Sequence, residues 1–172
     1  AILSMGAYSS MAIAAIVALV WQLRNAELAV IAIAPVGACV TAIALITGAA
    51  WGKPMWGAWW VWDARLTSVA ILFMLYLIII FLKNSFTNDS LGEKITAIFI
   101  IVGSINLPII KFSVDWWNTL HQPASISKLS SPSIDPSMMR PLIIMTIAFT
   151  LIALIIAIIR IKAEISERKL KN

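Results

Sequence analysis

Five long runs of apolar residues, separated by shorter polar or aromatic stretches, dominate the hydrophobic pattern of this chain. Each run is close to the roughly 20 residues that a helix needs to cross a ~30 Å hydrocarbon core. We expect every run to be helical, because backbone groups surrounded by lipid must find their hydrogen-bond partners within the segment. The pattern therefore predicts an all-α, polytopic transmembrane helix bundle, one membrane domain whose spans cover residues 1–23, 28–50, 66–82, 95–110 and 142–159.

Four connections separate these spans, and two prolines interrupt them. Residues 24–27 form a tight polar turn, 51–65 are aromatic, 83–94 are polar, and 111–141 are longest, with Ser and Pro abundant in their second half. Pro35 and Pro108 lie inside the second and fourth runs, where each predicts a kink.

The distribution of lysine and arginine predicts the orientation. Five of the thirteen basic residues follow Ile159, which places the tail over residues 160–172 in the cytoplasm. Alternation then puts the N-terminus, residues 51–65 and residues 111–141 outside. The tail decides the orientation, because without it the connections predicted outside hold more basic residues than those predicted inside. An external N-terminus that begins at Ala1 within an apolar run, without a basic leader, leads us to expect at least one further span before it.

Composition agrees with the membrane class and removes several others. The chain is 61% hydrophobic and 12% charged, against about 25% charged residues in soluble domains. The net charge of +5 is spread over the ends of the runs, without the basic groove and interleaved aromatics of a nucleic-acid binder. The single cysteine, Cys39, predicts a small buried side chain. Walker-type, Gly-x-Ser-x-Gly and HExxH motifs are absent from the sequence, and no general acid or base is evident, so we do not expect an enzyme.

The most informative feature is a cluster of five of the eight tryptophans within residues 51–62. An aromatic belt at the membrane interface is one interpretation, although a belt spreads its aromatics over all helix ends. The other is a surface for a flat, polarisable ligand, because indole rings offer large apolar faces and Gly52 and Gly57 permit close backbone approach. Helical spacing would place Trp56, Trp59 and Trp60 on one face, and Trp59 with Trp62.

Three charged residues flank this cluster. Asp63 is suited to capping the helix predicted to begin near Leu66, where the helix dipole favours an acid, and a ligand role stays equally open. Arg65 and Lys53 suit a carboxylate such as a porphyrin propionate, or an anchor at the lipid headgroups.

A second aromatic feature contains the only histidine. Residues 115–123 read Asp-Trp-Trp-Asn-Thr-Leu-His-Gln-Pro and lie on the same predicted side of the membrane as the tryptophan cluster. In a helix, Trp117 and His121 would share one face. An imidazole suits iron, and haem iron is commonly held by axial histidine. A six-coordinate haem would need a second ligand, which we expect in the segment before Ala1.

Residues 51–67, Trp-Gly-Lys-Pro-Met-Trp-Gly-Ala-Trp-Trp-Val-Trp-Asp-Ala-Arg-Leu-Thr, resemble the tryptophan-rich "WWD" signature of haem-handling proteins in cytochrome c maturation. Their Asp-Ala-Arg-Leu-Thr ending, with the later Trp-Trp-Asn-Thr-Leu-His-Gln, is similar specifically to the haem exporter protein C family. The resemblance implies a six-helix protein that holds b-type haem, non-covalently and transiently, at the periplasmic face. The implied haem-contacting residues are Trp51, Gly52, Trp56, Gly57, Trp59, Trp60, Trp62, Asp63, Arg65, Trp116 and Trp117, with His121 as an axial ligand of the iron.

The resemblance also implies partners and a location. Haem passes to a membrane-anchored haem chaperone (the E protein), accompanied by ABC transporter subunits (the A and B proteins) and a small accessory component (the D protein). The membrane is the bacterial inner (cytoplasmic) membrane, with the mitochondrial inner membrane as the alternative. The large haem lyase subunit, a permease-type structural subunit of an ABC transporter with the tryptophans as an interfacial anchor, and an aromatic anchor for quinone-linked enzymes are the competing hypotheses.

Overall fold

A computed structural model describes residues 1–86, 89–117 and 135–171 of the chain. In these ranges the chain forms helices and connecting turns. The helices are α1 (Ile2–Trp21), α2 (Arg24–Trp56), α3 (Ala64–Ser85), α4 (Asp89–Gly103), α5 (Asn106–Trp116) and α6 (Pro136–Lys171).

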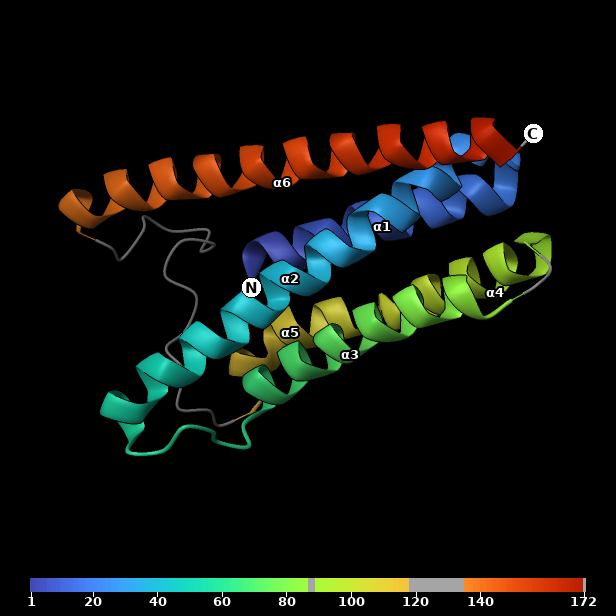
Figure 1. Ribbon diagram of the computed structural model, residues 1–172. Coiled ribbons are helices and arrows are strands. Elements are labelled where there is room, and N and C mark those ends of the chain that lie inside the picture. Colours follow the sequence, from blue (N-terminus) through green and yellow to red (C-terminus); the bar gives the residue numbers. More distant parts are fainter. Residues whose placement is uncertain (87–88, 118–134, 172) are drawn as a thin grey trace.

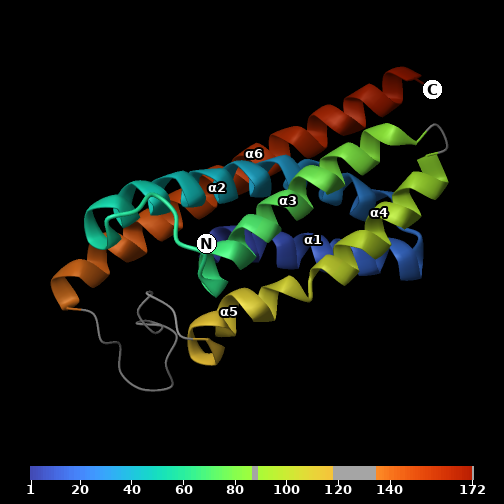
Figure 2. The ribbon, with the colours of Figure 1, turned by 90° about the horizontal axis from the view of Figure 1, so that it is seen from below.

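The predicted all-α, five-span architecture is confirmed. Within the described ranges, five helical stretches are long and apolar enough to cross a membrane, and α4 and α5 together make the fourth of them, Ser90–Trp116. The spans alternate in direction along the bundle, as Figures 1 and 2 show. The α1–α2 turn, the adjoining ends of α3 and α4, and the end of α6 lie at one end of the bundle. The α2–α3 connection, the end of α5 and the start of α6 lie at the other.

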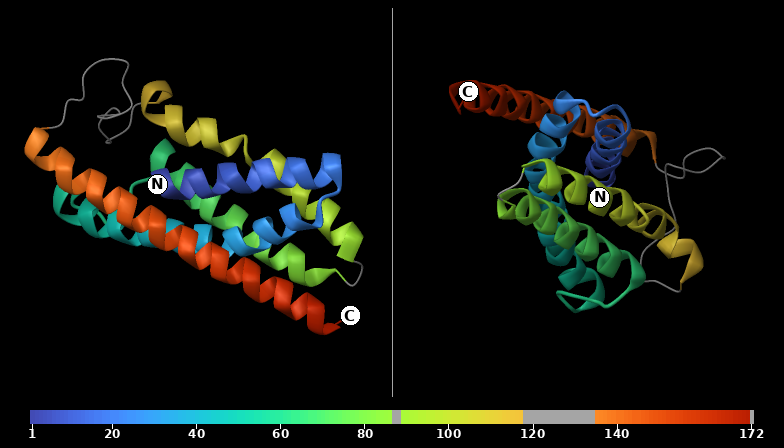
Figure 3. Two further views of the ribbon diagram at one scale, coloured as in Figure 1. Left: turned by 90° about the horizontal axis from the view of Figure 1, so that it is seen from above. Right: turned by 90° about the vertical axis from the view of Figure 1, so that its right-hand side faces the viewer.

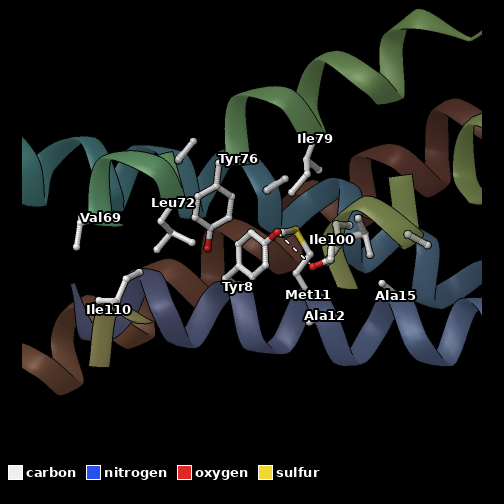
Figure 4. Close-up of a cluster of buried hydrophobic side chains, with 14 residues drawn as sticks. Tyr8, Met11, Ala12, Ala15, Val69, Leu72, Tyr76, Ile79, Ile100 and Ile110 are labelled. Carbon is white, nitrogen blue, oxygen red and sulfur yellow. Dashed lines mark hydrogen bonds between the residues drawn. The ribbon is translucent and has the colours of Figure 1, made fainter. Parts of the chain in front are cut away.

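The core is built where α1, α3 and α4 meet, with α2 packed against α1 and α3. Two fully buried tyrosines occupy its centre, with Tyr8 and Tyr76 in edge-to-face contact at 5.3 Å between ring centroids (Figure 4). Each hydroxyl donates to a main-chain carbonyl of another helix: Tyr8 to Ile100 at 3.2 Å and Tyr76 to Ser4 at 2.8 Å. These bonds satisfy the buried phenols and tie α1 to both α3 and α4.

Two glycines let helices approach these tyrosines closely. A Cβ added at Gly103 would overlap the hydroxyl of Tyr8, and one added at Gly37 would overlap the ring of Tyr76. Small residues at such crossings allow membrane helices to pack by van der Waals contact, because lipid supplies no hydrophobic drive between helices. Gly37 and Gly103 therefore set how closely α2 and α4 approach the core.

Helix α6 lies along the outside of the bundle, where it packs on α2 (Figure 3). None of the residues in its apolar span is buried, as befits a helix largely surrounded by lipid. An ion pair at 3.3 Å joins Lys83 of α3 to Glu164 in the C-terminal half of α6.

The boundaries differ from the sequence prediction in ways that have physical causes. Helix α2 continues through Pro35 and six residues beyond its expected end, to Trp56. The fourth span is interrupted at Ser104 and Ile105, one turn before Pro108. A proline lacks the N–H that would pair with the carbonyl four residues earlier, and the carbonyl of Ser104 instead accepts from the N–H of Leu107 at 3.0 Å. Cys39 is exposed on α2, so the prediction of a buried thiol was wrong.

Candidate functional site

The first part of the tryptophan cluster is the end of helix α2, not a loop. Trp51 and Trp56 lie in its last turns, with rings edge-to-face at 5.3 Å. Gly52 faces the second of them: a Cβ there would lie 3.1 Å from the Trp56 ring. Gly52 thus makes room for an indole of its own helix, which explains this glycine without a ligand.

Gly57 ends α2 in the left-handed conformation, with φ 75°, and its N–H donates to the carbonyl of Lys53 at 3.0 Å. The Lys53 ammonium returns to the carbonyl of Gly57 at 3.1 Å and lies 6.0 Å from the centroid of the Trp59 ring. A cation at a helix C-terminus complements the dipole. Lys53 is therefore engaged in closing α2, a role that the sequence interpretation did not include.

Beyond Gly57 the chain leaves the helix, so Trp59, Trp60 and Trp62 do not share a helical face as their spacing had suggested. Trp59 and Trp62 are 62% and 81% exposed. Trp60 is half-buried and packs edge-to-face on Trp62 at 5.7 Å. Its indole N–H is buried without a hydrogen-bond partner in the described part of the chain, which is a cost for a polar group out of water. This segment therefore exposes Trp59 and Trp62 and holds Trp60 half-buried.

Asp63 caps helix α3, which is one of the two roles that the sequence left open. Its carboxylate accepts from the N–H of Leu66 at 2.7 Å, and its main-chain carbonyl accepts from Thr67 at 3.0 Å. The residue is buried, with 9% of its surface exposed, and extended backbone at Asp63 gives way to helix at Ala64. Arg65 lies half-buried in the first turn of α3. The capping bond fixes where α3 begins and hence where the tryptophan-bearing segment ends.

The second cluster surrounds the end of α5. Trp116 stacks on Phe112 at 5.4 Å with an interplanar angle of 23°, and Trp117 meets Trp116 edge-on at 6.0 Å. Both tryptophans are more than half exposed. Phe112 was missed by sequence reasoning, although its spacing of four residues from Trp116 is a signal that could have found it.

Trp117 is extended, with φ −127° and ψ 149°, and it ends α5. The shared helical face predicted for Trp117 and His121 depends on residues 118–121, which are not among the described residues. His121 itself lies outside the described residues. Within the described ranges, no group of three or more His, Cys, Asp or Glu side chains is arranged to hold a metal ion.

The structure thus brings both tryptophan clusters to one end of the bundle. The α2–α3 connection and the end of α5 lie at that end in two perpendicular views (Figures 1 and 2). Seven of the eight tryptophans lie in the last turns of α2, in the α2–α3 connection or at the end of α5. The eighth, Trp21, ends α1 at the opposite end, where it is 62% exposed.

Comparison with known proteins points to one family. A family model described as "Heme exporter protein C" matches residues 1–172. Heme exporter protein C of Haemophilus influenzae is 53% identical over 172 residues, covering 100% of this chain and 70% of that protein. The protein of the same name from Escherichia coli K12 is 51% identical over 162 residues, covering 94% and 65%. A putative cytochrome c biosynthesis ccmC-like mitochondrial protein of Marchantia polymorpha is 46% identical over 142 residues, covering 83% and 59%. The chain spans about two thirds of the length of these bacterial relatives.

Proposed function

Because the chain belongs to the heme exporter protein C family, we propose that it is a haem-binding membrane subunit of the cytochrome c maturation system. In this role it holds haem at the tryptophan-bearing end of the bundle and passes it to a haem chaperone, the E protein. Haem is its cargo, bound non-covalently as b-type haem and released unchanged, so its task is haem transport and delivery.

The observation that carries this proposal is the concentration of exposed tryptophan rings at one end of the bundle. Trp51, Trp59, Trp62, Trp116 and Trp117 are each more than half exposed. Porphyrin is flat and apolar on both faces, and indole rings favour stacked or edge-on contact with such a group. An interfacial belt would place comparable aromatics at both ends, yet the opposite end carries Trp21 as its sole tryptophan in the sequence.

Charged residues that flank the tryptophans in the sequence suit the propionate groups of haem. A haem propionate is a carboxylate, and a guanidinium can pair with it through two parallel hydrogen bonds. Arg65, half-buried in the first turn of α3, is our candidate for this contact. Lys53 already pairs with the carbonyl of Gly57, which makes it the weaker candidate. Asp63 acts indirectly, because its carboxylate fixes the start of α3.

His121 is proposed as one axial ligand of the haem iron, four residues beyond the second tryptophan cluster. The proposed orientation has the basic tail over residues 160–172 in the cytoplasm. The haem site is then on the periplasmic side of a bacterial inner membrane or the equivalent side of a mitochondrial one. The proposed assembly also contains ABC transporter subunits, the A and B proteins, together with the small D protein.

Haem titration of the purified full-length protein tests this function. A Trp59 or Trp62 ring that gives up about 80 Å² of apolar surface to porphyrin contributes about 2 kcal/mol at about 25 cal/mol per Å², which corresponds to roughly thirtyfold in Kd. We expect that loss for Trp62→Ala and a weaker Soret band for His121→Ala. Trp21→Ala, which removes another exposed indole from the other end, is the matched control.

The outcomes separate the competing functions. Equal haem binding by Trp62→Ala, His121→Ala and Trp21→Ala would reject the proposed site. Absence of any Soret band in the full-length protein would leave the permease-type scaffold, with the tryptophans as an anchor. Quinone in place of haem in the extract would indicate the quinone-linked anchor.

A further inference from the structure

Helix α5 begins with a buried amide that reaches across to α3. Asn106 is the first residue of α5 and is 8% exposed, and its side-chain N–H donates to the main-chain carbonyl of Ser68 at 2.9 Å. Ser68 is itself 2% exposed. A buried amide without a partner costs free energy, and one register of α5 on α3 brings Asn106 to this carbonyl. The bond therefore selects that register.

This bond matters more because α5 is not a simple continuation of α4. The helix is interrupted at Ser104 and Ile105, where the hydrogen bonds become irregular: Ile105 N–H donates to Val102 at 3.2 Å and Leu107 N–H to Ser104 at 3.0 Å. Sharp changes of direction in helices occur at such interruptions. The direction of α5 is consequently set by its contacts with α3 and not by α4 alone.

Each of the two helices joined by Asn106 adjoins one tryptophan cluster. Helix α3 begins immediately after Trp62, at the Asp63 cap, five residues before Ser68. Helix α5 ends at Trp116. On the basis of the proposed function, we propose that Asn106 is a positioning residue that holds α5 in register with α3, so that the two tryptophan clusters keep the separation that haem requires.

The displacement of the end of α5 that a tilt at the interruption would cause can be estimated. Asn106 and Trp116 are ten residues apart, about 15 Å along a helix, so a tilt of about 15° at the interruption moves the far end by about 4 Å. A displacement of this size exceeds what stacking contacts tolerate, since attraction between atoms falls steeply beyond van der Waals distance.

Asn106→Leu removes the donor at similar volume, and Ser113→Ala is its matched control. Ser113 is fully buried on the same helix, but its hydroxyl donates to Ile110 within α5. Electron-electron double resonance between spin labels at Met55→Cys and Asp115→Cys, both exposed positions, would measure the separation of the two clusters in a Cys39→Ser background. We expect Asn106→Leu to shift or broaden the distance distribution by about 4 Å, and Ser113→Ala to leave it unchanged.

An unchanged distribution in Asn106→Leu would overturn the inference. If Asn106→Leu does not fold, Asn106→Ala, which removes the donor without adding an apolar branch, replaces it in the distance measurement. Haem titration supplies the second arm: Asn106→Leu should bind haem about tenfold more weakly as preorganisation is lost, with Ser113→Ala near wild type. If wild type binds no haem, the proposed function fails, whereas the distance measurement still decides whether Asn106 positions α5.

Discussion

Replacement of Gly57 tests how the tryptophan-bearing segment leaves helix α2. Gly57 has φ 75° and ψ −4°, and its N–H closes the last turn onto the carbonyl of Lys53. Glycine adopts this left-handed conformation without strain, whereas an L-residue with a Cβ pays roughly 1–2 kcal/mol. Apart from Gly57 itself and its two chain neighbours, no heavy atom of the described residues lies within 4 Å of an added Cβ at this position, so the backbone cost is the whole expected effect.

We therefore expect Gly57→Ala to lower the free energy of unfolding by about 1 kcal/mol, which for a chain of this size lowers Tm by about 2–4 °C. Gly57→Asn should lose less, because asparagine tolerates the left-handed region better than other residues with a side chain. Gly48→Ala is the matched control: Gly48 lies within α2 at negative φ, and an added Cβ there also meets open space. That substitution should stabilise the helix by roughly 0.5–1 kcal/mol.

Reversible unfolding in mixed micelles, followed by circular dichroism, gives all three free energies in one series. The reasoning fails if Gly57→Ala and Gly48→Ala change stability in the same direction. It also fails if asparagine costs more than alanine at position 57, because the ranking would then reflect something other than the left-handed backbone.

Two further predictions concern contacts that hold the helices together. Gly103→Ala should destabilise the protein by about 1–3 kcal/mol through overlap with the Tyr8 hydroxyl, and Tyr8→Phe should restore part of that loss. Gly37→Ala should cost as much, but Tyr76→Phe should not restore stability, because the overlap at Gly37 is with the ring itself. Thermal unfolding of the single and double variants compares the two sites, and equal rescue at both would contradict the geometry. Asp63→Ala should lower the free energy of unfolding by about 1 kcal/mol through loss of the cap on α3, whereas Asp63→Asn should retain most of the capping stability. Chemical unfolding separates the two variants, and equal losses would show that the carboxylate charge, not the capping bond, matters.

Sequence patterning was sufficient for the spans because a bilayer imposes length and polarity on every helix that crosses it. It was less informative about helix ends. Residues 51–56 look like a loop because glycine and proline are frequent there, yet Pro54 lies inside α2. The helix stops at Gly57, where the left-handed backbone and the Lys53 contact act together. A residue list does not show which of two nearby glycines will adopt positive φ.

The candidate site was predicted in composition but not in geometry. The sequence offered capping as one of two equally open roles for Asp63, because the rule for N-caps is local, and the capping bond is present in the structure. The helical face expected for Trp59 and Trp62 was wrong because it depended on where α2 ends. The bond from Asn106 to Ser68 joins residues that are 38 positions apart, and no local pattern indicates such a partner. Periodicity identifies faces, whereas register between helices depends on packing.

The concentration of tryptophan is the point at which fold and function meet. Topology alone brings the α2–α3 connection and the end of α5 to the same end of the bundle (Figure 1), since the spans alternate in direction. Topology does not require either segment to carry tryptophan, and the opposite end of the bundle has one, Trp21 at the end of α1. Anchoring at an interface needs aromatics on both sides of the membrane. An asymmetric distribution of tryptophan, between the Gly57 turn and the Asp63 cap and at the end of α5, is what the proposed binding surface facing one compartment requires.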